Sequence, residues 1–113
     1  MTTEIRIFPA EGTWVVRADG AIVAESRVAL EVTIGEAPFI IYFPRNDVAM
    51  AFVEPSGTLS TCPWRGEAVH FNIVASSGVM SDAGWSYDTP PGEFAQLEGH
   101  LAFDAGKVTV ERI

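Results

Sequence analysis

The chain has 113 residues, enough for one domain with its own hydrophobic core. Its 15 acidic and 7 basic side chains give a formal net charge of −8, which disfavours binding to nucleic acid or to an anionic membrane surface. One cysteine cannot form a disulfide within the chain, and neither a signal-peptide pattern nor an apolar run of bilayer length is present. We therefore expect a single cytoplasmic domain over residues 1–113, and the positive mean hydropathy is compatible with a homo-oligomer.

Apolar and polar side chains alternate along much of the chain, and this pattern predicts β-strands. The expected strands cover residues 4–8, 13–18, 21–25, 27–34, 38–43, 67–75, 78–87, 100–104 and 107–112. Segment 38–43 is apolar on both faces, which is typical of a central strand covered on both sides.

Two of these segments show the alternation most regularly. In segment 27–34 the predicted inner face consists of Val28, Leu30, Val32 and Ile34. In segment 67–75 the predicted inner face consists of Val69, Phe71 and Ile73, and the predicted outer face of Ala68, His70 and Asn72. Both segments are expected to be half-buried strands.

Turn residues separate the strands and predict three hairpins, at residues 18–20, 76–78 and 104–106. Segment 46–53 has Asn46 or Asp47 as a candidate N-cap, and segment 90–99 runs from a proline pair to a glycine, so each predicts a short helix. Pro44 and Pro63 are expected to end strands, because proline cannot donate a hydrogen bond to a sheet. The fold class is therefore a mostly-β domain of about eight short strands with one or two short helices.

Four stretches resemble, in order and spacing, the bacterial domain-of-unknown-function family 427 (DUF427). They are YFPRNDV (42–48), TCPWRGEA (61–68), AGWSYDTPP (83–91) and EGHLAFDAGKVTV (98–110). The resemblance covers nearly the whole chain and implies a compact β-tent-like fold with no established activity. Arg65 stands where this family often has lysine, and Trp64 replaces the more usual tyrosine. Some descriptions of the family use a nucleotidyltransferase label, but SSGVMSDAG (76–84) has one aspartate where paired carboxylates would hold catalytic metal ions.

Cys62 is the one cysteine, and it admits a catalytic and a structural interpretation. As a nucleophile it would use His70, or alternatively His100, as its base, with Arg65 lowering the pKa of the thiol. As a structural residue it would simply pack in a turn, since free cysteine is often buried. Zinc-binding relatives of the β-tent kind use two Cys-x-x-Cys pairs, and the spacing of Cys62, His70 and His100 matches no known zinc site. We expect no bound metal and no cofactor.

In each of the two most distinctive stretches, a proline and an aromatic residue precede an arginine. A guanidinium suits a carboxylate or phosphate, so the preferred hypothesis is a pocket for a small anionic molecule, formed by the 42–47, 61–67 and 83–91 loops. Its expected lining is Tyr42, Arg45, Cys62, Trp64, Arg65, Trp85 and Tyr87. The alternatives are local ion pairs of Arg45 with Asp47 and of Arg65 with Glu67, a small enzyme, or a scaffold without a ligand.

Overall fold

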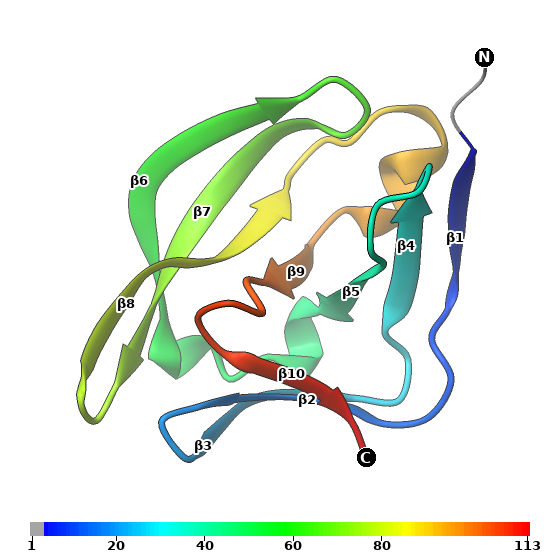
Figure 1. Ribbon diagram of the computed structural model, residues 1–113. Helices are drawn as coiled ribbons and strands as arrows, with labels where there is room; N and C mark the ends of the chain where they lie inside the picture. Colours follow the sequence, from blue (N-terminus) through cyan, green and yellow to red (C-terminus); the bar gives the residue numbers. More distant parts are fainter. Residues whose placement is uncertain (1–3) are drawn as a thin grey trace.

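The computed structural model describes residues 4–113, which form ten strands and three 3-10 helices (Figure 1). The strands are β1 (Ile5–Pro9), β2 (Trp14–Ala18), β3 (Ala21–Ser26), β4 (Leu30–Ile34), β5 (Ile40–Pro44), β6 (Val53–Cys62), β7 (Gly66–Ala75), β8 (Gly78–Tyr87), β9 (His100–Phe103) and β10 (Thr109–Arg112). The helices are η1 (Arg45–Asp47), η2 (Met50–Phe52) and η3 (Gly92–Leu97). The predicted mostly-β fold is confirmed. No helix among residues 4–113 is long and apolar enough to span a bilayer.

The strands pair antiparallel in two sheets. The larger sheet has the order β1-β4-β5-β9-β8-β7-β6, and the smaller has the order β10-β2-β3. In Figure 1 the smaller sheet lies below the middle strands of the larger one, and β10 runs across the opening between them. The β10 strand joins β2 rather than its chain neighbour β9, so the C-terminal strand forms one edge of the smaller sheet.

Two of the three predicted hairpins are confirmed. At 18–20, Asp19 and Gly20 have φ angles of 52° and 81°, the left-handed pair that a tight two-residue hairpin turn requires. Residues 76–78 join β7 to β8. The prediction at 104–106 was wrong, because the turn there carries the chain from the larger sheet to the smaller one. A backbone hydrogen bond from Lys107 to the Asp104 carbonyl (2.9 Å) closes this turn.

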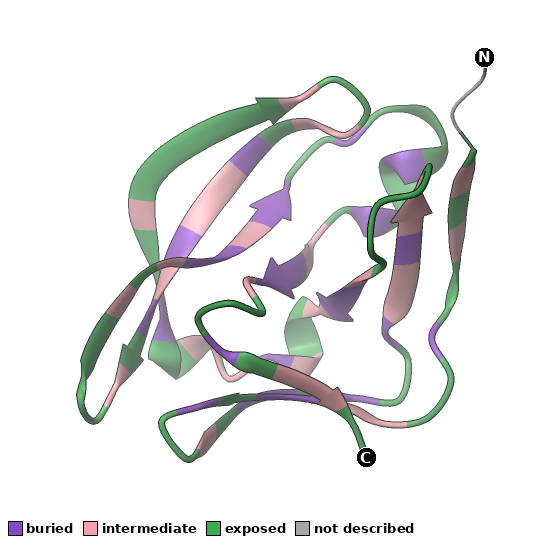
Figure 2. Cartoon of the chain, viewed as in Figure 1, coloured by how far each residue is buried: buried purple, intermediate pink, exposed green. Residues whose placement is uncertain are grey.

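The core has two parts, one on each face of β5. Ile41 and Phe43 belong to the first core cluster, with residues of β2, β3 and β9, while Tyr42 belongs to the second, with Tyr87 and Leu97. Successive side chains of a strand point to opposite faces, so both faces of β5 are covered. This confirms the prediction of a central covered strand, and Figure 2 shows the buried residues gathered on β5 and β9.

The predicted faces failed in two places. Ala68 was expected to face outward, but it is buried against the second core cluster. Segment 27–34 forms a strand only from Leu30, and Val28 is exposed, while Ala29 is buried and its carbonyl accepts a hydrogen bond from the Ala10 amide (2.9 Å). A simple alternation model assumes one covered face, whereas parts of this sheet are covered on both.

Strand β6 was not predicted, since Pro55 and Gly57 interrupt its pattern. It lies at the edge of the larger sheet, where proline is tolerated, and its register with β7 shifts between Pro55 and Leu59. The helix predicted over 46–53 is replaced by η1 and η2. Neither has a side-chain cap, and Asp47 instead accepts a hydrogen bond from the Ser26 hydroxyl at 2.6 Å.

The remaining helix and proline predictions are confirmed. The segment after the proline pair forms η3, a short 3-10 helix. Pro44 is the last residue of β5 and pairs only with His100 of β9, and Pro63 follows the last residue of β6.

Candidate functional site

The turn between β6 and β7 positions Arg65. Residues 63–65 form a three-residue turn, with Cys62 and Gly66 paired across its base. Gly66 has a φ of 88°, the left-handed conformation that commonly completes a turn of this length. As a result Arg65 folds back over the face of the larger sheet that carries the second core cluster.

Arg65 is surrounded there by two tyrosines, the cysteine and a tryptophan. Its Nη1 donates to the hydroxyl of Tyr42 (2.7 Å), its Nε donates to Sγ of Cys62 (3.2 Å), and its Cζ lies 5.1 Å from the ring centroid of Tyr87. Trp85 donates a long hydrogen bond from Nε1 to the same Tyr42 hydroxyl (3.4 Å). We call these five residues the Arg65 cluster: Tyr42, Cys62, Arg65, Trp85 and Tyr87.

Burial and the arginine act against each other on the titrating groups of the cluster. Partial burial opposes ionisation of Cys62, but hydrogen bonds from the Arg65 side chain and from the Trp64 and Arg65 amides outweigh it and lower the pKa of the thiol. Burial raises the pKa of Tyr42, and burial together with the nearby Tyr42 raises the pKa of Tyr87 to about 12. Burial also opposes the charge of Arg65, yet the surrounding hydroxyls and thiol raise its pKa overall. The cluster therefore keeps a charged guanidinium beside two neutral phenols.

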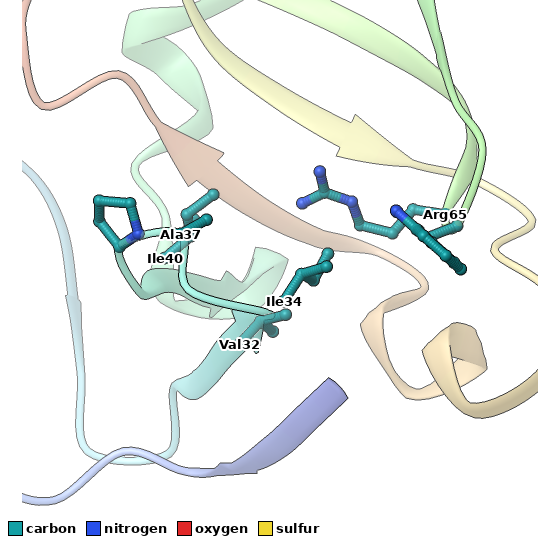
Figure 3. A pocket seen from close by; sticks show the side chains of 7 residues that line it. Val32, Ile34, Ala37, Ile40 and Arg65 are labelled. Carbon is teal, nitrogen blue, oxygen red and sulfur yellow. The ribbon is translucent and has the colours of Figure 1, made fainter. Parts of the chain in front are cut away.

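The guanidinium of Arg65 lies at the wall of an apolar pocket of about 210 Å³ (Figure 3). In that view Arg65 reaches from the β6–β7 turn toward the apolar side chains contributed by β4 and β5. The other lining residues are Val32, Ile34, Ala37, Pro38, Ile40 and Trp64. Arg65 thus provides the one charged group of this pocket.

No carboxylate pairs with Arg65 in the described chain. The ion pairs of residues 4–113 are Arg6 with Glu4 and Arg17 with Glu111, all with exposed side chains. The pair of Arg65 with Glu67 considered from the sequence is therefore not formed. Among the described hydrogen bonds Arg65 uses Nε and Nη1, so the Nη2 donors have no protein acceptor.

Arg45 is not brought to this cluster. It is exposed, and its Cζ lies 5.8 Å from the ring centroid of Phe71, a residue of the first core cluster. The ion pair with Asp47, considered as an alternative from the sequence, is also not formed among the described residues. The two arginines contact different core clusters, so only one of them serves the pocket. Tyr42 sits inside β5 and Trp85 and Tyr87 sit inside β8, rather than in loops.

The two histidines are likewise placed apart from the cysteine in the contacts of the described chain. His70 Nε2 is 2.7 Å from the hydroxyl of Ser60, a neighbour on strand β6. His100 Nδ1 is 3.2 Å from the carbonyl of Glu98. No hydrogen bond joins either ring to Cys62 within residues 4–113, and no group of three or more potential metal-ligating side chains occurs there.

Sequence reasoning missed the apolar side of the pocket. Val32, Ile34 and Ile40 were expected to be core residues of strands, and nothing in their pattern separates a pocket wall from a core. The pairing of Leu30 with Tyr42 would have revealed this wall, because it places β4 beside β5, the strand whose Tyr42 accepts a hydrogen bond from Arg65. That pairing is visible only in the sheet topology.

Fold and site together define a small antiparallel β domain in which an arginine on a hairpin turn closes an apolar pocket. The chain belongs to the family described as Domain of unknown function (DUF427), whose model, NTP_transf_9, matches residues 6–113. This confirms the resemblance carried by the four stretches from Tyr42 to Val110. No curated protein matches the chain.

Proposed function

We propose that this protein binds a small organic anion, with the charged group of the ligand on Arg65 and its apolar part in the adjoining pocket. The observation that carries the proposal is a half-buried guanidinium without a carboxylate partner among residues 4–113, facing a cavity of about 210 Å³. A charge removed from water is costly unless an opposite charge or several hydrogen bonds compensate it. An anion supplied by a ligand would provide that compensation.

The partners of Arg65 support this reading. Cys62 accepts a hydrogen bond from Nε, Tyr42 accepts one from Nη1, and Cζ lies over the ring of Tyr87, so the group is held in place before any ligand arrives. A fixed group loses little side-chain entropy on binding, and the planar fork of arginine matches a carboxylate or phosphate. The Nη2 donors, which have no acceptor among residues 4–113, are the ones available for this contact.

The rest of the pocket favours a short carboxylate over a phosphate. Apart from Arg65 and the indole N–H of Trp64, its lining side chains offer no hydrogen-bond donors for the remaining oxygens of a phosphate. A carboxylate can accept a hydrogen bond from the Nη2 donors of Arg65, and a short branched hydrocarbon would fill the aliphatic part of the pocket. The volume is below the roughly 300–1,000 Å³ of typical drug-sized sites, which also favours a small ligand.

The proposal is tested by calorimetric titration of the protein with isobutyrate, isobutyramide and inorganic phosphate. We expect saturable binding of isobutyrate, and weaker binding of the amide, which has the same shape without the charge. Arg65→Gln should weaken isobutyrate binding about tenfold or more, because it removes a charged hydrogen-bond donor. Arg45→Gln is the matched control and should bind as the wild type does.

Two results would contradict the proposal. One is equal binding of isobutyrate by the Arg65→Gln and Arg45→Gln variants. The other is equal affinity for isobutyrate and isobutyramide, which would show that the charge plays no part. Tighter binding of phosphate than of isobutyrate would retain the arginine site and overturn the choice of a carboxylate.

The alternative of a small enzyme using Cys62 has one supporting observation, the lowered pKa of its thiol. The base that this alternative needs is not in place, because His70 bonds to Ser60 and His100 to Glu98. We therefore assign Cys62 the role of positioning Arg65 in the binding site.

A further inference from the structure

A second and larger hollow lies on the other side of segment 37–40. It has a volume of about 720 Å³ and shares Ala37, Pro38 and Ile40 with the Arg65 pocket. We call it the inter-sheet groove, because β2 and β10 of the smaller sheet line it together with β5, β8 and β9 of the larger one.

Four aromatic side chains line the inter-sheet groove: Trp14, Phe39, Trp85 and Phe103. Trp14 and Phe39 meet edge to face, with ring centroids 5.9 Å apart and an angle of 76° between their planes. Phe39 is 51% exposed although it lies against Trp14, so it leaves a large apolar surface open to a partner. Aromatic walls of this kind suit a flat, ring-containing molecule, because stacked and edge-to-face contacts add to the burial of area.

The charged residues that line the groove indicate which net charge a bound molecule should carry. Three charged residues line it: Asp104, Glu111 and Arg112. Glu111 is paired with Arg17 at 3.1 Å, which leaves one carboxylate and one guanidinium. Asp104 accepts a hydrogen bond from the Gly106 amide (2.8 Å), and Arg112 forms no ion pair within residues 4–113. The remaining charges cancel, so the groove complements a molecule with no net charge that carries a donor for Asp104 or an acceptor for Arg112.

We propose that the inter-sheet groove is a second binding site, which accepts an uncharged, planar, ring-containing small molecule. Its volume lies within the roughly 300–1,000 Å³ of sites that take such ligands. The two proposed sites differ in the charge of the ligand that they accept. The Arg65 pocket offers a guanidinium without a carboxylate partner among residues 4–113, whereas the charges of the inter-sheet groove balance each other. Arg65 does not line the groove, so loss of anion binding in an Arg65 variant would leave the groove proposal standing.

The test uses two fluorescent probes that share one aromatic skeleton. N-phenyl-1-naphthylamine is uncharged, and 1-anilinonaphthalene-8-sulfonate carries an added sulfonate. We expect the uncharged probe to bind saturably, with one probe per chain. Its binding should quench the fluorescence of Trp14 and Trp85 by energy transfer. The sulfonate should bind about tenfold more weakly, because the field of a protein with net charge −8 opposes it.

Four variants test the location of the probe. Phe39→Ala should weaken binding of the uncharged probe about tenfold, because it removes one aromatic wall of the groove. Phe39 is already half exposed, so its loss should disturb the core little. Phe52→Ala is the matched control, since Phe52 is also exposed (40%) and lies outside the groove. Ala105→Trp should abolish binding by filling the groove from its exposed turn. Arg65→Gln should leave probe binding unchanged.

Several outcomes would overturn the proposal. Equal loss in the Phe39→Ala and Phe52→Ala variants would mean that the probe binds exposed apolar surface in general. Stronger binding of the sulfonate than of the uncharged probe would refute the charge argument. The groove would instead be assigned to a second copy of the chain if the probe were released as the protein concentration rises and sedimentation velocity showed dimers.

Discussion

At the scale of single residues, Arg65 sets the chemistry of the candidate site. It meets a thiol, a phenol hydroxyl and an aromatic ring, and each of these contacts changes how the partner titrates. The same contacts hold the guanidinium in one position. One side chain therefore determines the charge of the site, the orientation of the guanidinium and the pKa values of its neighbours.

The pKa of the Cys62 thiol should lie below its ordinary value in the wild-type protein, because hydrogen bonds from Arg65 outweigh the effect of partial burial. Arg65→Gln should raise it, and alkylation by iodoacetamide at neutral pH should then slow, since the thiolate is the reacting form. The rate measured against pH gives the pKa directly. Arg45→Gln, which changes an arginine outside the cluster, should leave the profile unchanged.

Tyrosine titration followed by ultraviolet absorbance should show that neither tyrosine ionises near the ordinary pKa of 10.0, and that Tyr87 ionises at about 12. Above pH 10 the unfolded chain loses these protons while the folded chain keeps them. The free energy of unfolding should therefore be unaffected below the ordinary pKa and should fall as pH rises from about 10 to about 12. Tyr87→Phe should reduce this fall, and a slope equal to that of the wild type would contradict the prediction.

At the scale of elements, the β6–β7 hairpin decides whether Arg65 reaches its cluster. Its turn depends on a left-handed glycine, and its last paired residues, Cys62 and Gly66, fix the direction of the three residues between them. The edge position of β6 allows the proline and the register shift that accompany this geometry. The binding site is thus built on a hairpin end rather than on a long loop.

Gly66→Ala should destabilise the fold by about 1–2 kcal/mol, because alanine is strained at a φ of 88°. A Cβ at this position would meet Pro91 at an ordinary 3.6 Å, so the cost comes from the backbone and not from a clash. The variant should also raise the pKa of the Cys62 thiol, since the turn can no longer hold Arg65 in place. Urea unfolding and the alkylation profile measure the two effects.

Gly20→Ala is the control for this prediction. Gly20 has a similar φ of 81° and open space around it, but it lies in the β2–β3 hairpin. It should cost a similar free energy of unfolding and leave the Cys62 titration unchanged. A shift of that titration in both variants would show that general loosening, and not the β6–β7 turn, controls Arg65.

At the scale of the whole molecule, β5 joins the two core clusters. Tyr42 packs into the second cluster and supports Arg65, while Ile41 and Phe43 pack into the first. Both proposed sites also use segment 37–40, which leads into this strand. A change in the packing of β5 should therefore affect the stability of the whole domain.

Phe43→Ala should lower the free energy of unfolding by about 3–5 kcal/mol, because Phe43 is fully buried and stacks edge to face on Phe103. Phe52→Ala, which removes the same side chain from an exposed position, should change stability far less. Chemical denaturation of the two variants side by side gives both values. A similar small loss in both would contradict the central role of β5.

The sequence by itself determined the mostly-β fold, two hairpins and the identity of the residues around Arg65. Strand alternation and turn glycines act locally, so they can be read without knowing what a strand packs against. The same holds for Pro44 and Pro63, whose missing amide donors end strands in any context.

Only the tertiary structure decided which arginine serves the pocket and what lines it. Arg45 and Arg65 look alike in their local sequence, but η1 and the β6–β7 turn place them against different core clusters. The apolar wall comes from β4 and β5, and the inter-sheet groove comes from the pairing of β10 with β2 across the chain. Such long-range strand pairings depend on burial summed over the whole sheet, and no short segment of the sequence encodes them.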